Sequence, residues 1–181
     1  MKTMKHLFKA SIAAIIVTMA IITFSSFSIV KKSGNSGVSC YQITLESKLP
    51  VSTGEQWTWS VTNVNPGNGS NGTLQNVSHW SVALNEQAEA ALVSAEYSFD
   101  GITWISVPIE MERDPSIRVC TSTDVLKFNM GTTGGQPTYY RASFNSHFET
   151  NCYATSWIKT GGGLQGCNLY YFHGPASQKL F

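Results

Sequence analysis

Short segments in which apolar and polar residues alternate run through the chain from residue 41 to residue 172. Tyr41, Ile43 and Leu45 alternate with polar neighbours, and Trp57 and Trp59 do the same. A period of two places successive side chains on opposite faces of a β-strand, so one face of each segment is expected to be buried. Turn-forming residues separate the segments. The pattern predicts an all-β fold, an antiparallel β-sandwich of jelly-roll or Ig-like type.

The remaining strands are predicted from the same alternation, over residues 78–84, 96–99, 102–105, 116–121, 125–130, 138–144, 155–159 and 168–172. Asp100 and Gly101 predict a two-residue type I′ hairpin turn, because both tolerate positive φ. Three glycines at residues 161–163 are expected to join the last two strands. Residues 85–96 are rich in Glu, Gln and Ala but show no clear apolar stripe, so a short surface helix there is an open alternative. The core is expected to contain Trp57, Trp59, Trp80 and Trp104.

The N-terminus has the form of an export signal. Lys2, Lys5 and Lys9 precede an apolar stretch over residues 10–24, and small residues at Ser26 and Ser28 suit cleavage ahead of residue 29. An uncleaved membrane anchor is the alternative, because the apolar stretch is long enough to span a bilayer. We therefore divide the chain into a signal peptide (1–28), a flexible leader (29–39), a β-sandwich domain (40–175) and a tail (176–181). In either case we expect the domain to be secreted or on the cell surface.

Removal of the signal changes the sign of the net charge. The full chain carries 12 basic and 11 acidic side chains, and loss of the three N-terminal lysines leaves nine basic ones against 11 acidic, a net charge of −2. No run of Lys or Arg remains. Because neutralisation of phosphates dominates binding to nucleic acids, we expect no nucleic-acid partner. A membrane is expected as a partner only through an uncleaved N-terminal segment.

All four cysteines, Cys40, Cys120, Cys152 and Cys167, follow the signal. An even number in an oxidising compartment favours two disulfides. Three pairings are possible, and we prefer the local pair Cys152–Cys167 together with Cys40–Cys120. A zinc site is the competing use, but no Cys-x-x-Cys spacing supports it.

Residue types that could carry catalysis are present without the spacing that catalysis needs. His79 beside Trp80 is interpreted as a hydrogen-bonded structural histidine. His147 and Glu149 could share a face, but no third metal ligand accompanies them. A pair of carboxylates is the requirement for a polysaccharide hydrolase, and candidates occur at Glu110, Glu112, Asp114 and Asp124. We predict no catalytic residues, no metal site and no cofactor.

The segment from Ser98 to Trp104, SFDGITW, resembles the Asp-box motif of sialidases and related propellers. It departs from that motif because Asp100 and Gly101 are adjacent, and because the chain has one copy where such propellers have repeats. The resemblance implies a structural turn in which the Asp side chain binds turn amides and the Trp packs beneath it. It does not imply enzymatic activity.

A longer series of segments resembles a recurrent β-rich domain of bacterial secreted and surface proteins. The series is WTWSVTN from residue 57, VSHWSV from residue 77, SFDGITW from residue 98, LKFN from residue 126 and YYRA from residue 139. Val77 stands where that pattern has Leu, and Asn129 where it has Asp. The resemblance covers roughly residues 40 to 175 and implies a secreted domain without an assigned activity.

The aromatic residues suggest a binding role. Five Trp, seven Tyr and nine Phe are present, and rings exposed on a sheet face can act as platforms for sugar rings. Tyrosines, which keep a polar group in water, are the candidates: Tyr139, Tyr140, Tyr153, Tyr170 and Tyr171. Adjacent residues on a strand point to opposite faces, so one of Tyr139/Tyr140 and one of Tyr170/Tyr171 should face solvent. We predict a non-catalytic extracellular domain with a structural, adhesive, or glycan- or protein-binding role. The alternative is a small secreted hydrolase that acts on polysaccharide.

Overall fold

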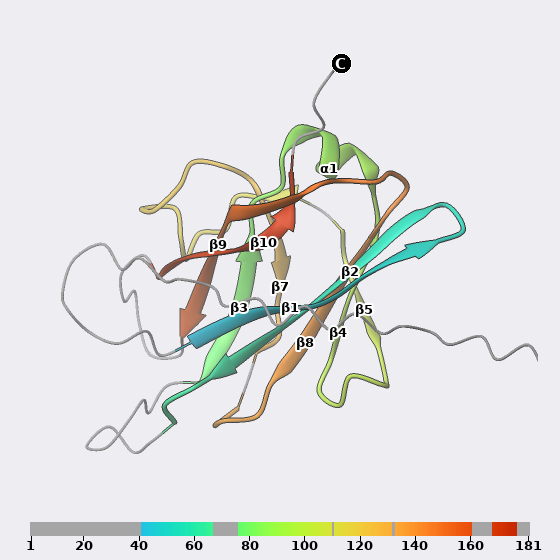
Figure 1. Ribbon diagram of the computed structural model, residues 1–181. Helices are drawn as coiled ribbons and strands as arrows, with labels where there is room; N and C mark the ends of the chain where they lie inside the picture. The colour runs from blue at the N-terminus through green and yellow to red at the C-terminus, as the bar shows by residue number, and fades with distance from the viewer. Residues whose placement is uncertain (1–40, 67–75, 110, 132, 161–167, 177–181) are drawn as a thin grey trace, which may run out of the picture.

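The computed structural model describes residues 41–66, 76–109, 111–131, 133–160 and 168–176. These residues form two five-stranded sheets whose strand pairs are all antiparallel, with one short helix at one end (Figure 1). The inner faces of both sheets contribute to one hydrophobic core. The all-β, sandwich-like architecture predicted from the alternation is confirmed at this level.

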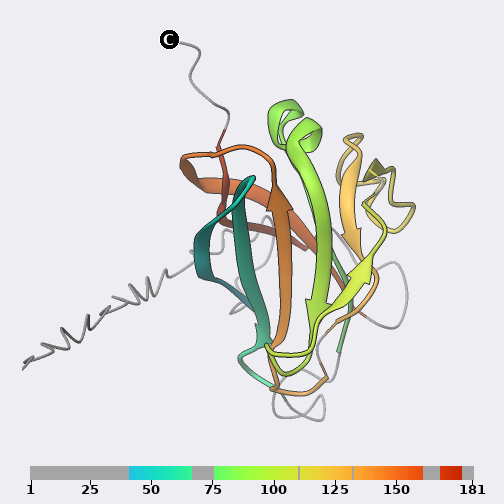
Figure 2. The same cartoon turned by 90° about the vertical axis from the view of Figure 1, so that its right-hand side faces the viewer.

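The first sheet has the strand order β1-β2-β8-β4-β5. Figure 2 shows its strands next to one another, from the teal β1 and β2 through the orange β8 to the green β4 and β5. Their bounds are β1 Tyr41–Val51, β2 Gly54–Asn63, β8 Thr138–Phe144, β4 Leu92–Ser98 and β5 Ile105–Val107.

The second sheet has the order β10-β9-β3-β7-β6. Its strands are β10 Leu169–Pro175, β9 Thr150–Thr160, β3 Val77–Val82, β7 Val125–Phe128 and β6 Met111–Glu112. The predicted final pairing is confirmed, since Leu169 faces Trp157 and Phe172 faces Ala154 in an antiparallel ladder. The glycines expected to join these two strands lie outside the described residues.

Aromatic rings from both sheets fill the space between them. Trp80 of β3 lies 5.9 Å from Trp59 of β2, 5.5 Å from Phe172 of β10 and 5.0 Å from Tyr140 of β8, measured between ring centroids. Trp57 adds a stacked contact with Trp59 at 6.0 Å. The three tryptophans are at most 2% exposed. Their predicted place in the core is confirmed, and each aromatic pair adds about 1 kcal/mol to the burial of apolar area.

A short helix is present between residues 85 and 96, where the sequence left a helix as an open alternative, but it covers only part of that range. Helix α1 spans Glu86–Ala91 and begins at the cap residue Asn85, whose side chain accepts hydrogen bonds from the backbone N–H groups of Gln87 and Ala88. Such a cap satisfies donors that a helix start leaves unpaired. The helix stops because the chain becomes extended at Leu92 and enters β4.

Three of the predicted local structures are wrong. The strand expected over residues 102–105 is irregular through Trp104, and β5 begins only at Ile105. Tyr97 pairs with Ile105, so a longer loop replaces the two-residue turn expected at Asp100-Gly101. Residues 116–121 form turns instead of a strand, because the Asp114 carboxylate accepts the backbone N–H of Ser116 and starts a turn. The apolar side chain of Ile117 is nevertheless buried, against Val125 and Trp157. An alternating sequence can therefore cover a sheet without joining it.

The cysteines differ from the expected pattern. Cys152 is exposed and carries a free thiol, so the preferred pair Cys152–Cys167 is wrong. The reason is its place on the solvent side of β9. Cys120 is half-buried and packs against the cluster formed by Ile117, Val125 and Trp157. Cys40 and Cys167 lie outside the described residues, so no pair of cysteines is seen within them.

The predicted signal peptide (1–28) and leader (29–39) also lie outside the described residues. Within the described ranges, no helix is long and apolar enough to cross a membrane.

Removal of the hydroxyl group should affect the free energy of unfolding differently at two equally buried serines. Ser156 of β9 and Ser81 of β3 are both fully buried, but Ser81 donates a hydrogen bond to Asp114, whereas the Ser156 hydroxyl has no partner among the described residues. A buried hydroxyl without a partner loses its hydration without compensation. Ser156→Ala should therefore leave the free energy of unfolding unchanged or raise it by up to about 1 kcal/mol, and Ser81→Ala should lower it by about 1–2 kcal/mol. Urea unfolding curves of both variants measure the difference, and equal losses would contradict it.

Candidate functional site

The four tyrosines predicted to form an aromatic surface divide between the core and the outer faces. Tyr140 is fully buried and donates a hydrogen bond from its hydroxyl to the carbonyl of Met130 at 2.7 Å, and Tyr170 is buried against Tyr41. Tyr139 and Tyr171 are half-exposed. The predicted alternation is therefore correct, but Tyr140 and Tyr170 do not belong to a surface, because the pleat turns them inward.

The outward-facing pair lies on opposite sides of the molecule. Tyr171 is on the second sheet, where its ring lies 6.3 Å from that of Tyr153, which is 76% exposed. Tyr139 is on the first sheet, where it pairs with Ser60 of β2 and Ser98 of β4. The structure thus does not bring the predicted tyrosines together into one site.

The outer face of the first sheet is polar. We call it the polar face, and it consists of Gln42, Thr44, Gln56, Thr58, Ser60, Ser94, Glu96, Tyr139, Arg141 and Ser143, aligned by the registers of β1, β2, β8 and β4. Except for the buried Ser60, these side chains are half-exposed. A sheet packed on one face normally shows this alternation between a buried apolar and a solvated polar side.

Trp104 lies on the polar face instead of in the core, where it was expected. The guanidinium of Arg141 is 4.0 Å from the centroid of the indole ring, and its Nε binds Glu96 Oε2 at 2.5 Å. A cation over the face of an aromatic ring is attracted by the ring quadrupole. Trp104 therefore packs on the Glu96–Arg141 ion pair and remains half-exposed.

The turn before Trp104 is held by Asp100. Its Oδ1 accepts hydrogen bonds from the backbone N–H of Thr103 at 2.7 Å, from that of Ile102 at 2.8 Å and from the hydroxyl of Ser98 at 2.8 Å. These bonds hold the pKa of Asp100 well below its usual range. Gly101 has φ of 72° and lies against the ring of Tyr139. The structural turn implied by the Asp-box resemblance is confirmed, except that the tryptophan packs on Arg141.

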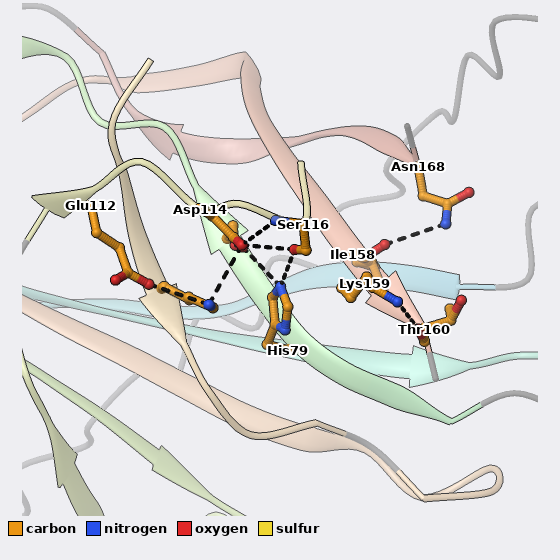
Figure 3. Close-up of polar contacts among 10 residues, drawn as sticks. His79, Glu112, Asp114, Ser116, Ile158, Lys159, Thr160 and Asn168 are labelled. Atoms are coloured by element: carbon orange, nitrogen blue, oxygen red, sulfur yellow. Dashed lines mark hydrogen bonds and ion pairs between the residues drawn. The ribbon is translucent and has the colours of Figure 1, made fainter. Parts of the chain in front are cut away.

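A second polar cluster, centred on Asp114, lies on the outer face of the second sheet (Figure 3). Asp114 Oδ2 is 2.8 Å from His79 Nε2 and 2.9 Å from the hydroxyl of Ser81. Its Oδ1 accepts the hydroxyl of Ser116 at 2.7 Å and lies 3.5 Å from Lys127 Nζ. Asp114 is 1% exposed. A buried carboxylate with this many donors is fully paired.

The surroundings set the charge states of this cluster. Burial by itself would raise the pKa of Asp114, but the hydrogen bonds from Ser116, the nearby His79 and the bond from Ser81 lower it to about 2. Burial also lowers the pKa of His79, and Lys127 and Lys159 act in the same direction, while Asp114 opposes them. The folded protein therefore favours an ionised Asp114 and a neutral His79.

The cluster contains Ser, His and Asp but not the geometry of a nucleophilic triad. Ser116 Oγ and Asp114 Oδ2 both contact the same imidazole nitrogen, His79 Nε2, at 3.0 Å and 2.8 Å. A triad needs the carboxylate on one ring nitrogen and the hydroxyl on the other, so that the second nitrogen can take the hydroxyl proton. The cluster instead holds the turns after Asp114 against the sheet, above Ile117 and Trp157. The predicted hydrogen bonding of His79 is confirmed.

Two of the other predicted carboxylates lie beside basic side chains. Glu112 lies 3.3 Å from Lys127 Nζ, and Asp124 is exposed, 3.9 Å from Arg113. Glu110 lies outside the described residues. A general acid needs a raised pKa, which is the opposite of the shift at Asp114.

Sequence reasoning missed Glu55, which is 3% exposed. Its Oε1 accepts the indole N–H of Trp57 at 2.5 Å and the backbone N–H of Phe148 at 2.9 Å, and its Oε2 faces Lys48 and His147. These contacts attach the segment after β8 to the start of β2. The sequence did contain an indication that Glu55 is buried. Its spacing of two residues from Trp57 places it on the inward face of the same strand. Among the described residues, no group of three metal-binding side chains includes His147 and Glu149.

An open hollow beside α1 is lined by Gln87, Ala90, Ala91, Asn145, Ser146 and Phe148. None of these six side chains is a carboxylate, an imidazole or a thiol. The hollow therefore offers hydrogen bonds and a small apolar surface but no group that could transfer a proton at neutral pH.

Comparison of the chain with protein-family models, with curated proteins and with solved structures found no match.

Removal of the charge at Asp114 should destabilise the fold. Asp114→Asn keeps the shape but weakens the hydrogen bonds from Ser81 and Ser116 and leaves Lys127 less compensated, so a loss of about 2–4 kcal/mol in the free energy of unfolding is expected. Asp124→Asn is the matched control, because the Asp124 side chain is 58% exposed, and it should lose less than about 0.5 kcal/mol. Denaturant unfolding measures both variants, and similar losses would show that the Asp114 cluster does not hold the fold.

His79 should make stability depend on pH. Because its pKa is lower in the folded protein than the usual 6.5, the unfolded chain binds the proton more readily, and stability should fall as the pH drops from about 7 to about 5. Asp114 does not contribute to this fall, because its stabilisation is lost only below about pH 4. His79→Gln, which can still donate to Asp114 but does not titrate, should flatten the dependence. Unfolding midpoints across this range test the expectation, and an unchanged slope in the variant would contradict it.

Proposed function

We propose that this protein is a non-catalytic domain, secreted or held at the cell surface, with a structural, adhesive, or glycan- or protein-binding role. The observation that carries the proposal is the polar face, on which Trp104 and Tyr139 stand among hydroxyl and amide side chains with little formal charge left unpaired. The export signal predicted at residues 1–28 and the predicted net charge of −2 after its removal support the extracellular site.

The arrangement of the polar face suits contact with a ligand. Its rings stay in place without the ligand, since Asp100 fixes the turn that bears Trp104 and Gly101 lies against Tyr139. Side chains that are already ordered lose little conformational entropy on binding. The second sheet differs, because the turns after Asp114 cover part of its outer face.

The alternative function is a polysaccharide hydrolase, which requires two carboxylates about 5–9.5 Å apart with one pKa raised. Glu112 and Asp114, which share Lys127, come nearest to this arrangement. The buried Asp114 is fully paired and its pKa is lowered to about 2. The contacts of Asp114 therefore favour binding over hydrolysis.

The finer fold assignment belongs to the same proposal. Of the jelly-roll and Ig-like types, the jelly roll is supported by repeated changes of sheet: between β2 and β3, β3 and β4, β5 and β6, β7 and β8, and β8 and β9. A disulfide between Cys120 and Cys167 is supported by the free thiol of Cys152 and by the packing of Cys120 against the same small cluster as Leu169, two residues after Cys167.

Export and the absence of hydrolysis can be tested together. The full chain is expressed in a bacterium, and the protein recovered outside the cytoplasm is analysed by intact mass and N-terminal sequencing. We expect a chain that begins at Ile29. Incubation of this protein with soluble polysaccharides should release no new reducing ends above a heat-denatured control.

Two results would contradict the proposal. Protein that keeps Met1 and stays in the cytoplasm would remove the extracellular role. Steady release of reducing ends, abolished by Asp114→Asn or by Glu112→Gln, would establish the hydrolase instead.

A further inference from the structure

We propose that the polar face binds an extended, neutral glycan, whose sugar rings stack on Trp104 and Tyr139. This inference rests on the proposed non-catalytic binding function and adds the location of the site and the chemistry of its ligand.

The first step concerns the orientation of Trp104. One face of its indole lies over the Arg141 guanidinium, 4.0 Å from ring centroid to Cζ. Arg141 is held in the plane of the sheet by Glu96 on the neighbouring strand. Because one face is covered in this way and the side chain is half-exposed, the opposite face of the indole is directed to solvent. A ring presented flat above a sheet offers its electron-rich face to the C–H groups of a pyranose.

The second step concerns the distance between the two rings. Tyr139 and Arg141 are two residues apart on β8, so their side chains leave the same face of the strand roughly 7 Å apart. Trp104 lies on Arg141, and Tyr139 lies beside the Gly101 turn. Both rings therefore stand over β8, Trp104 above Arg141 and Tyr139 beside the turn that precedes Trp104, an arrangement that suits an extended chain better than a single small molecule.

The third step concerns the groups around the rings. Thr58 pairs with Arg141, Ser60 pairs with Tyr139, and the amide of Gln56 donates to the hydroxyl of Ser143 at 3.0 Å. Hydroxyl and amide groups both donate and accept, as sugar hydroxyls do. The centres of protein–protein interfaces are about two-thirds apolar, whereas the polar face offers only the rings of Trp104 and Tyr139 among hydroxyl and amide groups. The composition of the face therefore favours a glycan over a protein.

The fourth step concerns charge. The guanidinium of Arg141 is bound to Glu96, and the carboxylate of Glu46 accepts the Ser60 hydroxyl at 2.5 Å. An anionic polysaccharide would have to compete with Glu96 for Arg141 and would meet the Glu46 carboxylate. A neutral glycan avoids both costs. Charge on the polar face thus selects against acidic polysaccharides.

The test uses the exported full chain and affinity electrophoresis in gels that contain a neutral polysaccharide (β-glucan, xylan or mannan) or the acidic polysaccharide pectin. At least one neutral polysaccharide should retard the protein more than pectin does. Trp104→Ala and Tyr139→Ala should each weaken that retardation about tenfold, the effect expected when one stacked ring is lost. Tyr171→Ala is the matched control, because Tyr171 is an equally half-exposed tyrosine on the other sheet, and it should bind as the unaltered protein does.

Two further variants separate stacking from folding. Trp104→Phe and Tyr139→Phe keep a ring at each position and should retain most of the binding, while unfolding curves of all variants report their stability. The proposal is overturned if no neutral polysaccharide retards the protein, if pectin binds more tightly, or if Tyr171→Ala abolishes binding while the alanine variants of the polar face do not. Each of these results leaves the proposed non-catalytic, exported domain standing, because that proposal fails on different results: new reducing ends, or a chain that stays in the cytoplasm.

Discussion

The contacts of Trp80 with rings from both sheets are the constraint on which the rest of the structure depends. Its indole meets Trp59 and Tyr140 of the first sheet and Phe128 and Phe172 of the second. Rings of this size fill the space between two sheets about 10 Å apart and fix how the sheets lie on each other. Because these rings all point inward, their strand neighbours must point outward. The chemistry of both outer faces is thus decided by the residues between the core aromatics.

Two aspartates each start a turn with the same kind of hydrogen bond, but the two turns have different effects on the sheet faces beside them. Asp100 and Asp114 each accept the backbone N–H of the residue two positions on and so start a turn. The turn after Asp114 is buried through His79 and Ser81 and covers part of the second sheet. The turn after Asp100 stays at the surface and places Trp104 on Arg141. One sheet face is consequently closed by its loop, while the other keeps an open row of polar groups beside an aromatic ring.

The sequence could not reveal the polar face as a site, because its parts come from strands far apart in the chain. Trp104 contacts Arg141 because β4 pairs with β8. No local sequence pattern predicts this contact. The same limit explains the error at Trp104 itself: it lies in the loop just before the short edge strand β5, so alternation alone could not show what its side chain would cover. Glu55 was missed for a related reason, since its partners Phe148 and Lys48 are brought to it by the fold.

The sequence by itself determined the all-β class, the inward direction of Trp57, Trp59 and Trp80, the opposite facing of adjacent tyrosines and the hydrogen bonding of His79. These features depend on a period of two residues, or on the chemistry of one side chain, and both are local. Only the tertiary structure decided how the strands before the last two pair, that residues 116–121 cover a sheet instead of joining it, and that Cys152 remains free. Those outcomes depend on contacts between residues distant in the chain, whose free energy is set by the packing of the whole core.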